Sequence, residues 1–288
     1  MRIAGAPISW GVCEVPGWGH QMPPSRVLAE MRDLGLEATE FGPQGWLPVA
    51  PDERAAVLRS HGLAAVGAFV PVLLHDPDHD PVPEVDRELE SFEAAGGDVL
   101  VLAAASGQDG YDERPELDER GWATLLANLD RLRDLAAARG ITTTLHPHVG
   151  TMVETREDVT RVLDGSGVGL CLDTGHLLIG GTDPVALARD HAARITHVHA
   201  KDVRTALAER VRAGELTYTE AVRAGIYAPL GEGDIDLAAI FTALDAAGFG
   251  GWVVLEQDTM IDAEPAGEGP LADVRTSLAH LRDLAARA

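Results

Sequence analysis

Short apolar runs alternate with helical patterns along the whole chain, and this alternation restricts the fold more than any other feature. The runs are apolar throughout instead of every second residue, as strands buried on both faces must be. They fall at residues 3–9, 36–41, 63–70, 98–104, 141–146, 168–173, 194–200 and 251–256. Strands that alternate with helices predict an α/β fold with a parallel sheet.

The segments between the runs carry the helical period. Residues 117–139 place four leucines on one face, and the pattern stops at Gly140, a residue type favoured just after a helix. Eight strands with intervening helices and no linker predict a (β/α)8 TIM barrel, with residues 1–288 as a single domain. An open doubly wound sheet is the alternative, but no Gly-x-Gly-x-x-Gly motif follows the first run.

The interval 203–235 is too long for a plain loop between the seventh strand and its helix. Two short helical patterns lie within it, at 206–212 and 219–223. We therefore expect a helical insertion after strand seven that covers the rim of the barrel.

Four polar motifs close four of the apolar runs, at the end of the strands where barrel enzymes carry their active sites. They are Leu-His-Pro-His (145–148), Leu-Asp-Thr-Gly-His (172–176), His-Val-His-Ala-Lys-Asp (197–202) and Leu-Glu-Gln-Asp (255–258). Imidazole and carboxylate groups brought to one rim by successive strands suit a divalent metal with open positions for substrate. The motifs therefore predict a metalloenzyme.

Asp173, His199 and Glu256 are the first candidates for metal ligands. Asp173 and Glu256 each follow an apolar run, where a bare carboxylate is costly unless it is paired or bound to a metal. On the fifth strand either His146 or His148 coordinates the metal, and His146 is favoured because it lies deeper.

Two further histidines have a second interpretation. His197 shares one face of its strand with His199, so it is either a ligand or a core histidine. His176 follows Asp173 by three residues and either contacts substrate, hydrogen-bonds a ligand or caps the next segment.

Two other rim segments are candidates for substrate contact. The loop after the first run carries Trp10, Glu14 and Trp18 among glycines, which indicates either a sugar-stacking wall or ordinary rim packing. Glu40 closes the second run, and whether it touches substrate is left open.

The charge of the chain limits its partners. Asp plus Glu number 46 and Lys plus Arg number 23, a formal charge of −23 at pH 7. Such a surface repels phosphate backbones and anionic lipids, so neither nucleic acid nor a membrane is an expected partner. Two cysteines, no signal-peptide pattern at the first residues and no apolar run near the ~18 residues of a membrane span predict a cytoplasmic protein.

The motifs resemble those of the xylose isomerase-like TIM barrel superfamily, which includes sugar isomerases, epimerases and inosose dehydratases, and the resemblance covers essentially the whole chain. It implies a divalent metal (Mn, Co or Zn) on Asp173, His199 and Glu256. The superfamily usually has a glutamate on strand five, whereas this chain has His146 within Leu-His-Pro-His-Val-Gly-Thr. That departure resembles the inosose dehydratase branch, as do Ala-Pro-Ile-Ser-Trp-Gly and the His-Ala-Lys-Asp-Val-Arg stretch that ends at Arg204.

The resemblance implies a metal-dependent lyase that dehydrates a keto-inositol through an enediolate. An α-proton needs a base and the enolate oxygen needs a Lewis acid. The candidates for proton transfer are His176, Lys201 and Glu256. The candidates for contact with a small polyol or keto-sugar are Trp10, Glu14, Glu40, His148 and Arg204.

Three other functions are alternatives to this one. A metal-dependent isomerase or epimerase would reprotonate the same enediolate instead of losing hydroxide from it. An apurinic-site endonuclease shares this barrel but needs a basic groove, which a charge of −23 disfavours. A non-catalytic binding protein would be expected to lose ligands that are all in place here. Assembly into a homo-oligomer is left open.

Overall fold

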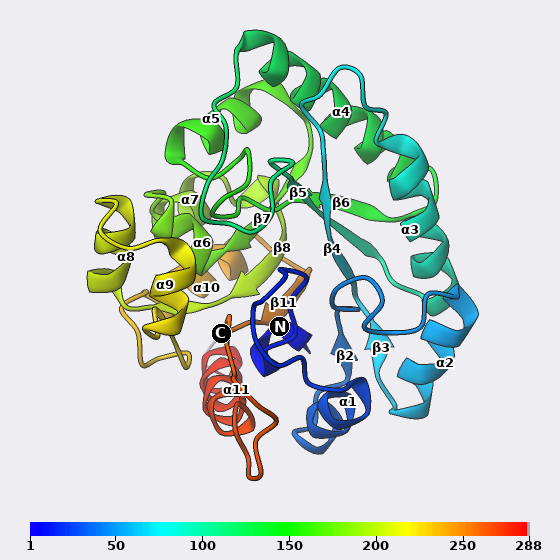
Figure 1. Cartoon of the computed structure of the whole chain (residues 1–288), viewed down its shortest axis with the longest axis vertical. Helices are drawn as coiled ribbons and strands as arrows, with labels where there is room; N and C mark the ends of the chain where they lie inside the picture. Colours follow the sequence, from blue (N-terminus) through cyan, green and yellow to red (C-terminus); the bar gives the residue numbers. More distant parts are fainter. Residues whose placement is uncertain (287–288) are drawn as a thin grey trace.

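The computed structural model describes residues 1–286, and they form a barrel of parallel strands surrounded by helices (Figure 1). The main sheet has nine strands in the order β3-β2-β1-β11-β8-β7-β6-β5-β4. Their bounds are β1 Arg2–Gly5, β2 Ala38–Thr39, β3 Ala64–Ala65, β4 Gly67–Val72, β5 Val99–Ala104, β6 Thr142–Leu145, β7 Gly169–Asp173, β8 Ile195–Ala200 and β11 Trp252–Leu255.

Strands β3 and β4 are two halves of the run at 63–70, and the chain changes its pairing partner between them. β3 pairs with β2, and β4 pairs with β5. Val66, the residue between β3 and β4, hydrogen-bonds in both directions. Its N–H donates to Thr39 O at 2.9 Å, and its carbonyl accepts from Asp98 N at 2.9 Å. With β3 and β4 counted as one strand, the sheet is the predicted eight-stranded barrel.

Gly67 makes this change of partner sterically feasible. Its φ is +157°, and a Cβ built there would lie 1.7 Å from the carbonyl oxygen of Val99. Backbone this close to a neighbouring strand admits only glycine.

Helices fill the connections around the barrel (Figure 1). Helix α4 matches the pattern at 117–139, and Asp118 caps it by accepting from Gly121 N. The helical pattern at 270–287 forms the last helix, which runs from Leu271 to Ala285; residue 287 lies outside the described part. The bounds are α1 Pro24–Asp33, α2 Pro51–Ser60, α3 Val82–Ala95, α4 Glu119–Ala137, α5 Arg156–Gly165, α6 Thr174–Ile179, α7 Pro184–Asp190, α10 Leu237–Ala246 and α11 Leu271–Ala285.

The predicted insertion after the seventh barrel strand is confirmed. It holds β9 (Asp202–Val203), α8 (Thr205–Arg212), α9 (Tyr218–Arg223) and β10 (Tyr227–Ala228), and β9 pairs antiparallel with β10. The Asp202 carboxylate accepts backbone N–H groups of the segment that leaves the insertion, from Gly231 at 2.9 Å and from Gly233 at 3.0 Å. One buried carboxylate therefore ties the end of the insertion to its beginning.

The first run, expected as a strand over 3–9, ends earlier. Strand β1 stops at Gly5, and a 3-10 helix follows over Pro7–Trp10. The cause is Pro7, which lacks the N–H that a continuing ladder needs.

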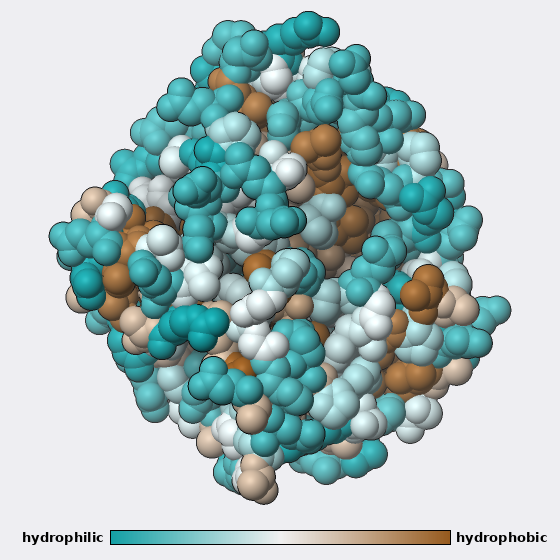
Figure 2. Space-filling model, in the orientation of Figure 1, coloured by the Kyte–Doolittle hydropathy of each residue, from teal (hydrophilic) through white to brown (hydrophobic). Residues whose placement is uncertain are grey.

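The face of the molecule in Figure 2 is mostly hydrophilic, with hydrophobic side chains exposed in a hollow over the region of β4. Among residues 1–286, no helix is both long and apolar enough to cross a membrane.

Candidate metal centre and active-site cavity

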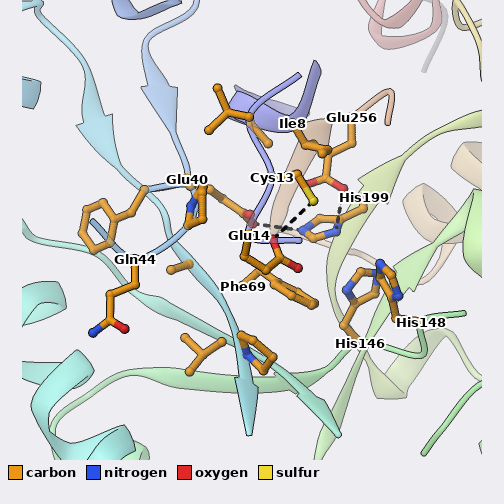
Figure 3. A pocket seen from close by; sticks show the side chains of 18 of the residues that line it. Ile8, Cys13, Glu14, Glu40, Gln44, Phe69, His146, His148, His199 and Glu256 are labelled. Atoms are coloured by element: carbon orange, nitrogen blue, oxygen red, sulfur yellow. Dashed lines mark hydrogen bonds and ion pairs between the residues drawn. The ribbon is translucent and has the colours of Figure 1, made fainter. Parts of the chain in front are cut away.

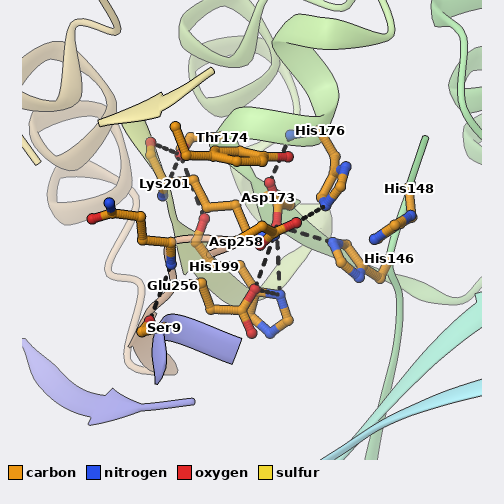
Figure 4. Close-up of polar contacts among 12 residues, drawn as sticks. Ser9, His146, His148, Asp173, Thr174, His176, His199, Lys201, Glu256 and Asp258 are labelled. Carbon is orange, nitrogen blue, oxygen red and sulfur yellow. Dashed lines mark hydrogen bonds and ion pairs between the residues drawn. The ribbon is translucent and has the colours of Figure 1, made fainter. Parts of the chain in front are cut away.

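The four polar motifs lie together at the C-terminal ends of β6, β7, β8 and β11, which are consecutive neighbours in the sheet. Asp173 is in register with His199 across β7 and β8. Glu256 directly follows β11, the next strand. The side chains of His146, Asp173, His199 and Glu256 are all buried, so adjacent parallel strands carry them to one enclosed place (Figure 4).

Asp173 is the residue on which the cluster converges. Its Oδ2 lies 3.0 Å from Nε2 of His146 and 3.6 Å from Nδ1 of His199. The same Nδ1 lies 3.2 Å from Oε2 of Glu256. Asp173, His199 and Glu256 offer ligand atoms within 4.8 Å of one another, and His146 forms a second such group with Asp173 and His176.

The polar groups of this cluster fit a divalent cation. Nδ1 of His199 is buried and has no hydrogen bond within the described residues, although two carboxylates face it. Burial lowers the pKa of His146 to about 4, which keeps its ring neutral, as a ligand must be. Imidazole nitrogens beside carboxylate oxygens are the donor set that Zn²⁺, Mn²⁺ and Co²⁺ accept.

Lys201 is the only lysine in the chain, and it is buried among three carboxylates. Its Nζ lies 3.3 Å from Asp173 Oδ2, 3.2 Å from Glu256 Oε2 and 2.6 Å from Asp258 Oδ1. Burial alone lowers the pKa of Lys201, but these carboxylates outweigh it and hold the pKa well above its usual value. The site therefore contains a charged ammonium.

Glu40 fixes the orientation of two histidines. Nε2 of His197 and Nε2 of His199 both donate to Glu40 Oε1 at 3.0 Å. Burial raises the pKa of Glu40, but the two imidazoles outweigh it and hold the pKa below its usual range. His197, which the sequence left as ligand or core residue, is fully buried and contacts the cluster through Glu40.

A second group of polar side chains lies behind the first. The rings of His148 and His176 stack with centroids 3.6 Å apart, and Nδ1 of His148 donates to the carbonyl of Val149 at 2.7 Å. Nε2 of His176 lies 3.5 Å from Asp258 Oδ2, which also accepts the Tyr218 hydroxyl at 2.5 Å. Burial lowers the pKa of His148 well below its usual value.

The backbone N–H of His176 donates to Asp173 Oδ1 at 2.7 Å, so Asp173 is the N-cap of α6. Asp258 and Tyr218 were not among the residues expected from the sequence. Asp258 belongs to the 255–258 motif and follows Glu256 by two residues, which is a usable signal. Tyr218 belongs to the insertion, and no sequence pattern places it here.

A cavity of about 370 Å³ opens beside these residues. Glu14, Glu40 and His148, three of the expected substrate contacts, line it together with Glu256 (Figure 3). Lys201 lines it as well. Neither Asp173 nor His176 lines the cavity; both lie behind the residues that do.

The structure does not bring Trp10 and Arg204 to the cavity. Trp10 is fully buried, and its Nε1 donates to Glu30 Oε2 at 2.7 Å. The Arg204 guanidinium donates to carbonyl oxygens of the insertion, those of Gly225 and of Tyr227, the latter at 3.1 Å. Trp18, from the same loop as Trp10, does line the cavity.

Comparison with known proteins assigns the family. A sequence model described as "Xylose isomerase-like TIM barrel" matches residues 28–284. The chain belongs to the xylose isomerase-like TIM barrel family.

The curated relatives of this sequence include inosose dehydratases and a rhizopine catabolism protein. The chain is 34% identical over 276 residues to an inosose dehydratase of Geobacillus kaustophilus, covering 90% of this chain and 87% of the relative. It is 31% identical over 269 residues to an inosose dehydratase of Geobacillus thermodenitrificans, covering 90% of each. It is 34% identical over 297 residues to the rhizopine catabolism protein MocC of Rhizobium meliloti, covering 100% of this chain and 90% of MocC.

Solved structures of the same fold include epimerases. An L-ribulose 3-epimerase superposes with a TM-score of 0.71 at 18% identity, over 98% of this chain and 94% of the other. An IolI protein with a binding zinc atom superposes with a TM-score of 0.72 at 17% identity, over 100% and 99%. At these identities the superpositions show the fold alone, and the likeness confirms the TIM barrel.

Proposed function

We propose that this protein is a divalent-metal-dependent lyase that removes water from a keto-inositol. The observation that carries the proposal is the convergence of His146, Asp173, His199 and Glu256 beside the charged Lys201. All of these residues except Asp173 line one cavity. The inosose dehydratases at 31% and 34% identity support the choice of reaction.

Asp173, His199 and Glu256, with His146 as the fourth, are the residues that would hold the metal. When bound, a divalent cation supplies a Lewis acid for the oxygen of the substrate ketone and its neighbouring hydroxyl. Burial lowers the pKa of His199, but the neighbouring carboxylates of Glu256 and Glu40 outweigh it and hold the pKa above its usual value. A metal held here would therefore displace a proton from this ring.

Two cavity-lining residues divide the proton transfers between them. Dehydration takes a proton from the carbon beside the ketone and supplies one to the β-hydroxyl as it leaves. The Glu256 carboxylate accepts the first proton, and the Lys201 ammonium donates the second, which turns the leaving hydroxyl into water. Because Nζ of Lys201 lies 3.2 Å from Glu256 Oε2, the proton on Glu256 can then return to Lys201.

The other side chains position this pair. Asp258 holds Lys201 Nζ at 2.6 Å, and Tyr218 in turn holds Asp258. His176, also a candidate for proton transfer, lies behind His148, so it acts through the stacked pair instead of by contact with substrate.

A sugar or ketose isomerase or epimerase is the alternative on the same residues. It needs the same α-proton removed and returns a proton to carbon instead of to a departing hydroxyl. The sequence relatives favour the lyase. Both cysteines are free, which agrees with a reducing compartment, and we place the enzyme in the cytoplasm.

Metal removal and return tests the proposal. The purified protein should hold about one divalent ion per chain, lose turnover of 2-keto-myo-inositol on chelation, and recover it with Mn²⁺ or Co²⁺. Asp173→Asn should abolish metal uptake and turnover together. Asp190→Asn, at a surface pair with Arg189, is the matched control and should behave as wild type. Full turnover by Asp173→Asn, or by the chelated enzyme, contradicts the proposal.

A further inference from the structure

The cavity extends beyond the barrel mouth, past the residues that the proposed chemistry uses. It is lined at one end by His146, His148 and Glu256 and at the other by Glu84, Arg87 and Glu88 of helix α3. Because α3 belongs to the outer layer of helices (Figure 1), one cavity can reach both sets only by running across the rim. In Figure 3, Gln44 lies on the opposite side from His146 and His148, with Phe69 between.

We call the distant part the outer arm and define it by the cavity-lining residues Gln44, Arg54, Glu84, Arg87 and Glu88. A volume of about 370 Å³ lies within the ~300–1,000 Å³ range of sites that enclose drug-sized ligands. The metal-side end needs to accommodate only the ketone ring and the hydroxyl that leaves. The outer arm is therefore available to a part of the ligand that does not react.

The outer arm is a preformed polar site. Arg54 is buried, its Nε donates to Pro48 O at 3.0 Å, and its Nη1 lies 3.4 Å from Glu88 Oε2. Gln44 Nε2 donates to the other Glu88 oxygen at 3.5 Å. The Arg54 guanidinium also lies over the Phe41 ring, 5.1 Å from its centroid. These contacts fix a donor-and-acceptor cluster on the cavity wall, which is the kind of surface that sugar hydroxyls bind.

Charge decides the kind of group that this arm can bind. Within it, Arg54 and Arg87 are balanced by Glu84 and Glu88, and Arg54 is already paired. The whole lining has six carboxylates and three cationic side chains: Glu14, Glu40, Glu84, Glu88, Glu256 and Asp258 against Arg54, Arg87 and Lys201. A phosphate or carboxylate substituent would meet an acidic wall on which the buried guanidinium of Arg54 is already paired with Glu88.

We propose that the outer arm binds an uncharged, hydroxylated substituent on the reacting ring, of the size of a second sugar ring, so that the preferred substrates are glycosyl-substituted keto-cyclitols. This inference rests on the proposed function, because it takes the ring at the metal-side end to be a cyclitol. Gln44 and Glu88 become residues that determine specificity without taking part in the reaction.

Calorimetric titration with three unreactive alcohols tests the proposal on the metal-loaded protein. The probes are myo-inositol, galactinol (a galactosyl-myo-inositol) and myo-inositol 1-phosphate. Galactinol should bind at least about tenfold more tightly than myo-inositol, since its galactosyl hydroxyls meet Gln44 and Glu88. The phosphate should bind no more tightly than myo-inositol.

The double variant Gln44→Ala with Glu88→Gln should reduce the galactinol preference to under about threefold and leave myo-inositol binding unchanged, which also shows that it is folded. Gln108→Ala, at an exposed loop position outside the cavity lining, should keep the full preference. Equal affinity for galactinol and myo-inositol overturns the inference and leaves the proposed function standing. Tighter binding of the phosphate overturns it in favour of an anionic substituent. If no inositol binds, the proposed function and the inference both fail.

Discussion

Nζ of Lys201 lies 3.2 Å from Oε2 of Glu256, so the only lysine ammonium of the chain stands directly beside a candidate metal ligand. The ammonium also contacts Asp173 and Asp258. It therefore neutralises part of a buried cluster of carboxylates, and it also lines the cavity.

Replacing this ammonium should separate catalysis from metal binding. Lys201→Met should lower kcat for 2-keto-myo-inositol at least about 100-fold, because the proton donor is lost. Metal content, measured by elemental analysis after Mn²⁺ loading, should remain near one ion per chain. Arg204→Met, the matched control at a cation turned away from the cavity, should leave kcat and KM unchanged. A Lys201→Met enzyme with wild-type kcat would rule Lys201 out as the proton donor.

The same substitution should destabilise the metal-free protein. Three buried carboxylates would lose their shared cation, and breaking a buried ion pair in this way costs roughly 3–5 kcal/mol. We expect the loss in thermal midpoint to be smaller in the Mn²⁺-loaded protein, because the bound cation offsets the carboxylate charge. Equal losses with and without metal would contradict a shared carboxylate cluster.

Replacing each of the two histidines of the fifth barrel strand should have a different effect, one on metal binding and the other on KM. Both line the cavity, but His146 contacts Asp173 at 3.0 Å, whereas His148 donates its Nδ1 hydrogen to Val149 O. His146→Ala should weaken Mn²⁺ or Zn²⁺ binding at least about tenfold in competition with a chelator, because a ligand is lost. His148→Ala should mainly raise KM. The reverse outcome would exchange the two roles and keep the site.

The division of the run at 63–70 into β3 and β4 leads to a prediction about stability. Gly62→Ala, at φ +71° with open space around it, should cost about 1 kcal/mol from backbone strain alone. Gly67→Ala should cost about 3 kcal/mol or more, because its Cβ would collide with the Val99 carbonyl oxygen and force β4 away from β5. Urea unfolding of the two variants measures the difference. Similar costs would show that the change of pairing partner tolerates a side chain.

The sequence predicts the barrel because each strand is buried on both faces and leaves an apolar run. It does not predict that the run at 63–70 divides at Val66, since that depends on which neighbour each half reaches. The early end of β1 could be predicted from the sequence, because Pro7 has no N–H to continue the hydrogen bonds between strands. That all 288 residues form one domain stays a prediction.

The residues of the candidate site also include some that the sequence predicts and some that it does not. The convergence of His146, Asp173, His199 and Glu256 could be predicted, because strand ends of a parallel barrel meet at one rim. The position of Tyr218 could not, because its approach to Asp258 depends on how the insertion folds back over the rim. Trp10 and Arg204 were expected at the substrate from their neighbourhood in sequence, and each instead turns to a partner outside the cavity, Glu30 and the insertion backbone.

Product analysis with 2-keto-myo-inositol and the Mn²⁺-loaded enzyme in D₂O distinguishes dehydration from isomerisation. We expect a product lighter than the substrate by one water and a new ultraviolet absorption, because elimination conjugates a new double bond with the ketone. Asp173→Asn should give neither signal. Recovery of an isomeric ketose that carries deuterium, with no loss of water and no new absorption, would contradict the lyase and assign the site to an isomerase or epimerase.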